Sequence, residues 1–162
     1  MGARREGKAL ANTGRHNHQL CVAEALHRAE TVCKDSGARM TSLRRMVLEQ
    51  VWRGHDAVKA YDILAWLGRK RRSANPPTVY RALQFLQQEG LVHRLESLNA
   101  FVGCSQPRGN HQGQFLICGK CGQVSEMEAR EITRLVSESA KAKGFITHRQ
   151  TIEVHGVCGQ CA

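Results

Sequence analysis

Apolar side chains recur at helical spacing in the first ninety residues of the chain. Four segments repeat such a side chain every three or four positions, as an amphipathic helix does, and they cover residues 20–33, 41–54, 60–68 and 76–90. Thr41 is a favourable N-cap for the second segment. Pro76 and Pro77 suit the first turn of the fourth, where the amide hydrogen that proline lacks has no helical partner. The pattern therefore predicts four helices.

After residue 90 the pattern changes to short apolar runs that are typical of strands. The first two runs, 91–95 and 100–104, are joined by a short polar turn. Helices followed by such a hairpin are the pattern of a winged helix-turn-helix. Beyond it we expect two strands, a helix and a last strand, at residues 114–118, 123–126, 132–144 and 145–154. The predicted fold class is α+β, with an N-terminal winged helix-turn-helix domain followed by a small α/β domain.

Two polar stretches divide the chain into its predicted parts. Residues 1–18 are polar, rich in Arg and His and without a period, so we expect a flexible basic arm. The turn-rich stretch SQPRGNHQG at residues 105–113 is predicted to be a hinge linker. The winged-helix domain therefore spans residues 19–104, and the second domain spans residues 114–162.

Charge is concentrated in the first of these domains. The chain has 24 Lys and Arg against 14 Asp and Glu, a formal net charge of +10 at pH 7. Residues 1–96 carry 17 basic and 9 acidic side chains, and residues 97–162 carry 7 and 5. The longest apolar stretches, such as residues 115–118, are far shorter than the roughly 18 residues of a membrane helix. We expect a cytoplasmic protein with no membrane partner.

The fourth predicted helix has the composition of a DNA-reading helix. Opposite its apolar stripe it carries side chains that offer hydrogen bonds, and Arg matches the major-groove edge of guanine. Arg81 is the predicted base reader and Gln84 the second, with Thr78 and Tyr80 beside them. Packing against the second helix is the alternative role for Tyr80. Phosphate contacts, which set register without reading sequence, are predicted for Arg44, Arg45 and Tyr61.

Four of the seven cysteines form two C-x-x-C pairs, which predict a zinc site. Thirty-six residues separate the pairs, and glycines next to the cysteines allow tight turns around an ion. Four thiolates close a tetrahedral zinc shell and leave no position for a substrate, so we interpret the site as structural. Redox-active or merely buried thiols are the alternative. The predicted ligands are Cys118, Cys121, Cys158 and Cys161.

A second set of metal ligands is less evident from spacing. His93 and Cys104 lie on the two hairpin strands, His111 lies in the linker and Glu126 lies in the second domain. Two imidazoles, a thiolate and a carboxylate are suitable zinc ligands. Taken singly, each residue has another explanation, as an exposed wing His, a buried Cys, a loop His or a solvated Glu.

Long sequence motifs resemble the ferric-uptake-regulator superfamily, and within it the zinc-uptake-regulator branch. The resemblance spans about residues 20–161 and rests on PPTVYRALQFLQQEGLVHRLESLNAFVGC, HQGQFLICGKCGQVSE and TIEVHGVCGQC. It implies that the four paired cysteines form the structural site and that His93, Cys104, His111 and Glu126 form the regulatory site. It also supports DNA contacts by Tyr80, Arg81, Arg44 and Tyr61.

The function that the resemblance implies is zinc-responsive repression of transcription. Zn²⁺ is expected as co-repressor, with one structural and one regulatory ion per subunit. A third site that uses some of the other histidines is left open. The expected partners are a second copy of the chain and palindromic double-stranded operators of zinc uptake genes, with no small organic substrate and no catalytic residues. The alternatives are an iron or peroxide sensor of the same family and a thiol-redox zinc switch.

Overall fold

The computed structural model describes residues 18–54, 56–70, 75–107, 113–148 and 150–162. The predicted basic arm, apart from its last residue, and the middle of the predicted linker lie outside these described residues. His111 also lies outside them, so its predicted role as a metal ligand stays a prediction.

Four helices form the first half of the chain as the pattern predicts. They are α1 (His18–Ser36), α2 (Ser42–Trp52), α3 (Ala60–Lys70) and α4 (Pro76–Gln88). Thr41 caps α2 by accepting a hydrogen bond from the Arg44 amide at 3.3 Å. Asn75 caps α4 by accepting one from the Thr78 amide at 3.0 Å. Gly90 leaves α4 with a φ of 68°, which favours glycine.

Two helix boundaries differ from the prediction. Helix α1 extends through Ser36, three residues beyond the last apolar residue of its pattern, and ends where Gly37 adopts a φ of 72°. Helix α3 continues through Gly68 to Lys70. The side chains of Arg69 and Lys70 stabilise this last turn because cations interact favourably with the negative end of the helix dipole.

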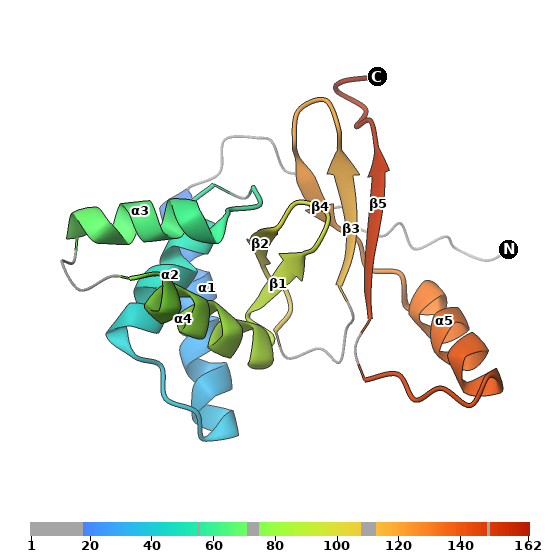
Figure 1. Cartoon of the computed structure of the whole chain (residues 1–162), viewed down its shortest axis with the longest axis horizontal. Helices are drawn as coiled ribbons and strands as arrows, with labels where there is room; N and C mark the ends of the chain where they lie inside the picture. The colour runs from blue at the N-terminus through green and yellow to red at the C-terminus, as the bar shows by residue number, and fades with distance from the viewer. Residues whose placement is uncertain (1–17, 55, 71–74, 108–112, 149) are drawn as a thin grey trace, which may run out of the picture.

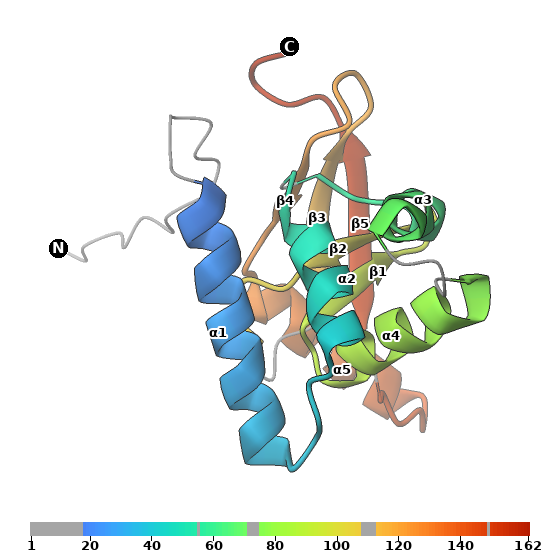
Figure 2. The same cartoon turned by 90° about the vertical axis from the view of Figure 1, so that its left-hand side faces the viewer.

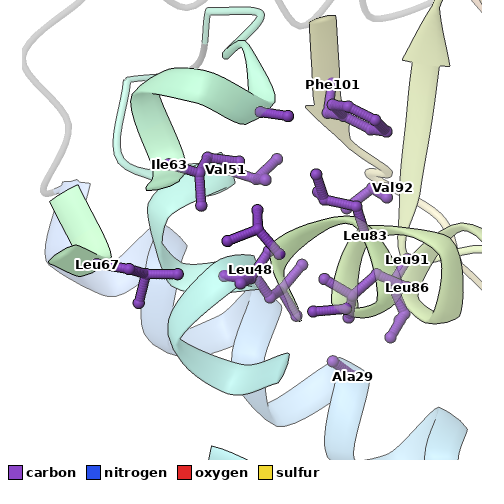
Figure 3. Packing of buried hydrophobic residues seen from close by; sticks show 14 of the residues in the cluster. Ala29, Leu48, Val51, Ile63, Leu67, Leu83, Leu86, Leu91, Val92 and Phe101 are labelled. Carbon is purple, nitrogen blue, oxygen red and sulfur yellow. The ribbon is translucent and has the colours of Figure 1, made fainter. Parts of the chain in front are cut away.

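One hydrophobic core joins the four helices to the hairpin (Figures 2 and 3). Helices α2 and α4 each contribute three large buried side chains, α3 contributes two, and α1 contributes the fully buried Ala29. The strand residues Val92 and Phe101 close this core from the side of the hairpin. The large helical side chains are Val47, Leu48, Val51, Ile63, Leu67, Val79, Leu83 and Leu86. Burial of their apolar surface stabilises the orientation of α4.

The hairpin, which is the wing of the winged helix-turn-helix, consists of β1 (Val92–Leu95) and β2 (Ala100–Gly103). Its strands pair antiparallel, with Val92 opposite Gly103 and Leu95 opposite Ala100. Phe101 also exchanges two backbone hydrogen bonds of 2.8 Å with Val58. The wing is therefore attached to the segment between α2 and α3 through backbone bonds, and to the helices through the core.

The second half consists of a three-stranded sheet and one helix that lies beside it (Figure 1). Strands β3 (Gly113–Cys118), β4 (Val124–Glu126) and β5 (Thr151–Gly156) lie in the order β4, β3, β5. Strand β4 pairs antiparallel with β3, and β5 pairs parallel with it. Helix α5 (Arg130–Ala142) makes the crossover between β4 and β5.

The last strand begins later than the sequence predicts. We expected it from Phe145, but β5 begins at Thr151. Gly144, with a φ of 71°, ends the helix. The chain must then return to the start of β3 before parallel pairing with Gly113 is possible. The apolar residues Phe145 and Ile146 lie on this return and are exposed.

The wing packs against one face of the sheet. Leu95 of β1 shares a small buried cluster with Phe115, Ile117 and Val124. The Glu153 carboxylate of β5 also accepts hydrogen bonds from the wing turn, from the Glu96 amide at 2.7 Å and the Ser97 amide at 3.2 Å. These contacts bring the two halves of the chain together next to the end of β4. Among the described residues, no helix has both the length and the hydropathy needed to cross a membrane.

Candidate metal centres and nucleic-acid interface

The two cysteine pairs meet at one end of the sheet. Cys118 ends β3, Cys121 lies in the following turn, and Cys158 and Cys161 follow β5. Because β3 and β5 are parallel neighbours, both pairs lie at the same end. All four sulfur atoms lie within 4.8 Å of one another. Cys121 Sγ and Cys158 Sγ are 3.8 Å apart, which matches the edge of about 3.8 Å in a tetrahedron with zinc–sulfur bonds of about 2.3 Å.

Backbone amides prepare these thiols for a cation. The Cys158 amide donates to Cys118 Sγ at 3.3 Å. Hydrogen bonds from the Cys121 and Cys158 amides lower the pKa of Cys118 to about 6. The neighbouring thiols, Cys158 first, raise the pKa of Cys161 to about 12. Cys118 therefore loses its proton more readily than Cys161, and a metal ion that binds to Cys161 must displace the proton of that thiol.

Three of the four predicted regulatory ligands also come together. His93 lies on β1, Cys104 directly follows β2 and Glu126 ends β4. Their ligand atoms lie within 4.8 Å of one another. His93 Nε2 is 3.5 Å from Glu126 Oε1, close to the edge of about 3.4 Å in a tetrahedron with zinc–nitrogen or zinc–oxygen bonds of about 2.0 to 2.1 Å. The imidazole, thiol and carboxylate of this set, with these spacings, fit Zn²⁺.

The environment tunes the acidity of two of these ligands. Burial raises the pKa of the Cys104 thiol to about 12, and the adjacent Glu126 carboxylate adds to the effect. Burial alone would also raise the pKa of Glu126. Hydrogen bonds from His93 and Ser105 outweigh burial and lower that pKa to about 2. Metal binding must therefore displace a proton from Cys104, whereas Glu126 is already ionised, so binding is favoured by rising pH.

The backbone around His93 leaves little free space. The His93 ring packs edge to face on Phe115, with ring centroids 5.2 Å apart. A Cβ atom at Gly113 would lie 2.8 Å from His93 Nδ1 and 2.5 Å from the Phe115 ring. Glycine is therefore required at the first position of β3 for this placement of the imidazole.

The predicted base-reading side chains lie on the solvent side of α4. Arg81 and Gln84 are exposed, and Tyr80 is 56% exposed. More than half of Tyr80 is therefore accessible to solvent. Thr78 is half-buried, and its hydroxyl donates to the capping Asn75 side chain. Tyr61, in the first turn of α3, is 76% exposed.

The two arginines of α2 are engaged within the chain. The Arg44 guanidinium lies over the Phe85 ring, 3.4 Å from its centroid, and donates to the Arg39 carbonyl. Arg45 forms an ion pair with Glu30 of α1. Both side chains therefore join helices to each other, in addition to the phosphate contacts predicted for them.

The remaining cysteines and His155 lie outside both ligand sets. Cys33 is buried in the core, and Cys21 is half-buried. His155 is exposed, and its Nε2 is 3.0 Å from Ser97 Oγ, so its hydrogen-bonding partner is the wing turn. The hydrogen bonds of Ser105 and Glu153 between the halves were not predicted. The one feature of the sequence that could have indicated a role for Ser105 is its position next to the predicted ligand Cys104.

The chain combines a winged helix-turn-helix, the fold of a DNA-binding protein, with a three-stranded sheet. One candidate metal-ligand set lies at the end of the sheet, and the other lies between the sheet and the hairpin. The model of the Ferric uptake regulator family matches residues 35–155. The chain belongs to this family. It is 38% identical over 141 residues to the zinc uptake regulation protein of Escherichia coli (strain K12), and the match covers 85% of this chain and 81% of that protein.

Solved structures of zinc uptake regulators resemble this chain closely. The structure "Zinc Uptake Regulator Complexed With Zinc AND DNA" is 35% identical, with a TM-score of 0.80 over 91% of this chain and 96% of that chain. Holo XcZur is 42% identical, with a TM-score of 0.78 over 85% of this chain and 96% of its own. Apo XcZur is 41% identical, and the match covers 86% of this chain and 97% of that chain, but its TM-score is only 0.51. The arrangement described here is therefore more similar to that of holo XcZur than to that of apo XcZur.

Proposed function

We propose that this protein is a zinc-responsive transcriptional repressor, in which Zn²⁺ acts as co-repressor. The observation that carries the proposal is the convergence of His93, Cys104 and Glu126 from the wing and the sheet. A metal ion held by ligands from both halves stabilises one arrangement of those halves. The similarity to zinc uptake regulators and the Cys104 thiol, a soft ligand, favour zinc over iron.

The proposed functions of the parts of the chain follow the domain boundaries predicted from the sequence. Residues 19–104 bind DNA, residues 105–113 act as the hinge, and residues 114–162 form the dimerisation and zinc-binding domain. The four paired cysteines hold a structural ion that ties the end of the chain to the sheet. The four ligands His93, Cys104, His111 and Glu126 hold the regulatory ion.

A second copy of the chain is the partner that best covers the apolar surface of the second half. Helix α5 buries none of its residues in the described chain. Its apolar side chains stay exposed, as do Leu116 and Val154, which pair across β3 and β5. An exposed apolar helix face and an exposed apolar cross-strand pair of this kind mark a protein interface. The exposed α5 side chains are Ile132, Leu135 and Val136.

Dimerisation explains how the metal controls DNA binding. Two helix-turn-helix units read a palindrome when their reading helices lie about one DNA turn, roughly 34 Å, apart. Ligands from both halves of each subunit fix this separation when they share an ion. Without that constraint, DNA binding must also order the hinge. Zinc and DNA therefore strengthen each other's binding.

A titration of DNA binding against buffered free zinc tests the proposal. Operators are first selected from genomic DNA at saturating zinc, and their affinity is then measured by fluorescence anisotropy. We expect tight binding to appear with the second zinc equivalent per subunit. Equal affinity with and without that equivalent would contradict the proposal. A response to Fe²⁺ alone, or to peroxide alone, would favour the corresponding alternative.

Replacing Arg81 by alanine should weaken binding to the selected operator by about 1 to 3 kcal/mol. The reason is that Arg81 is exposed on α4, where its guanidinium can donate to O6 and N7 of guanine. Anisotropy with the operator and with random DNA measures the effect. Arg69→Ala removes the same side chain from the exposed end of α3 and is the matched control. Equal losses on both DNAs would show that Arg81 contacts phosphate instead of bases.

A further inference from the structure

The two oxygen atoms of the Glu126 carboxylate have different surroundings. Oε2 accepts two hydrogen bonds from Ser105, one from the hydroxyl at 2.6 Å and one from the amide at 3.2 Å. Oε1 lies 3.5 Å from Nε2 of His93. The carboxylate is therefore oriented with one oxygen toward Ser105 and the other toward the ligand set.

Ser105 occupies a position from which it can hold Glu126 firmly. It directly follows Cys104, whose amide donates to the Leu91 carbonyl at 3.0 Å and so fixes this part of the backbone on the wing. Glu126 lies 21 residues further along, at the end of β4. The side chain of Glu126 is only 18% exposed, so water competes weakly for its oxygen atoms. Cys104 thus supplies a thiol ligand, and the adjacent Ser105 holds a carboxylate ligand through two hydrogen bonds, which we call a clamp.

We infer that Ser105 is a positioning residue that restricts Glu126 to metal binding through Oε1 alone. The inference rests on the proposed function, because it takes His93, Cys104 and Glu126 as ligands of the regulatory ion. A carboxylate that binds through both oxygens raises the coordination number, which suits larger cations with oxygen ligands. A carboxylate held to one oxygen completes a four-coordinate shell, which zinc prefers. Ser105 therefore favours zinc at this site over Mn²⁺ and Fe²⁺.

The chain offers a matched control for this clamp. Ser97 also donates its hydroxyl and its amide to a carboxylate of the other half, that of Glu153. Both clamps join the halves, but the Ser97 clamp does not involve any of the proposed regulatory ligands. If loss of the serine hydroxyl acts only through the docking of the halves, Ser105→Ala and Ser97→Ala should have the same effect. If it acts through the geometry of the metal ligands, only Ser105→Ala should have an effect.

The test uses the full-length dimer with Ser105→Ala, Ser105→Thr and Ser97→Ala. Zinc affinity is measured by competition with a chromophoric chelator, and coordination is read from the visible absorption bands of the Co²⁺-loaded protein. We expect Ser105→Ala to weaken the regulatory site about 10-fold, the usual effect of losing a hydrogen-bond partner of a ligand. Its Co²⁺ bands should also lose the intensity of a four-coordinate site. Ser105→Thr, which keeps the hydroxyl, and Ser97→Ala should keep the wild-type bands.

The outcomes separate this inference from the proposed function. Wild-type affinity and wild-type Co²⁺ bands in Ser105→Ala would overturn the role of Ser105 and leave the proposed function intact. Equal changes in Ser105→Ala and Ser97→Ala would also overturn it, because docking of the halves would then explain both. A wild-type dimer that takes up no second metal ion per subunit would overturn the proposed function and the inference together.

Discussion

Cys121→Ser should release the tightly bound zinc and convert the dimer into monomers whose second half is unfolded. The second half has little apolar core of its own, since its buried cluster is small and includes Leu95 from the wing. Small domains of this kind depend on a metal for stability. A structural zinc site contributes roughly 10 to 16 kcal/mol of apparent binding free energy, and loss of one of four thiolates removes a large part of it.

Three measurements check this expectation. Metal content after dialysis against a chelator reports the ion, sedimentation reports the dimer, and circular dichroism reports the fold. Cys21→Ser is the control, because it removes one thiol from α1, outside both ligand sets. It should keep its zinc and remain dimeric. A Cys121→Ser protein that also keeps one tightly bound zinc per chain and stays dimeric would contradict the structural assignment.

Local patterns in the sequence were sufficient to predict the helices and the cysteine set. Thr41 defines the start of α2 through a hydrogen bond from Arg44, three positions later, and Pro76 suits the first turn of α4 because its φ is already helical. A C-x-x-C pair likewise closes on itself within a turn, as the Cys158 carbonyl and the Cys161 amide do at 2.9 Å. These features need no information about the rest of the fold. The TM-score of 0.80 to a zinc- and DNA-bound relative shows that the overall arrangement also followed from the family motifs.

Features that depend on distant partners could not be predicted from spacing. The start of β5 was wrong because it is set by pairing with β3, some 38 positions earlier in the chain. The second ligand set combines His93 of β1, Cys104 directly after β2 and Glu126 of β4, and spacing indicated it less clearly than the resemblance to the family did. The hydrogen bonds from Ser105 to Glu126 and from Ser97 to Glu153 cross between the halves. No local pattern marks such contacts before the fold is known.

The two ligand sets differ in how they relate to the halves of the chain. All four paired cysteines belong to the second half, so an ion there stabilises that half whatever the position of the wing. The set of His93, Cys104 and Glu126 exists only while the wing lies against the sheet. At nearly equal identity, this chain matches holo XcZur far better than apo XcZur. In the proposed function, the second set is therefore the one that couples metal binding to the geometry of the reading helices.

Cys104→Ser should keep the structural zinc and the dimer but lose the zinc-dependent gain in operator affinity. Serine is a poor zinc ligand in place of a thiolate, so the ion no longer stabilises contact between the halves. Coupling of about 1 to 3 kcal/mol per site corresponds to 5- to 150-fold in affinity. Near-complete switching needs about 5.5 kcal/mol, which two such sites in a dimer reach when each contributes close to 3 kcal/mol. Anisotropy at saturating zinc should therefore give the affinity of the chelator-treated wild-type protein.

Cys33→Ser provides the matched control for this prediction. Cys33 and Cys104 are equally buried, 1% and 2% exposed, but Cys33 lies in the helical core outside both ligand sets. The cost of burying a hydroxyl is therefore similar in the two variants, and only Cys104→Ser removes a metal ligand. Cys33→Ser should retain the zinc response. If both variants lose it, the loss arises from the packing of the first half, and the coupling between metal and DNA does not pass through Cys104.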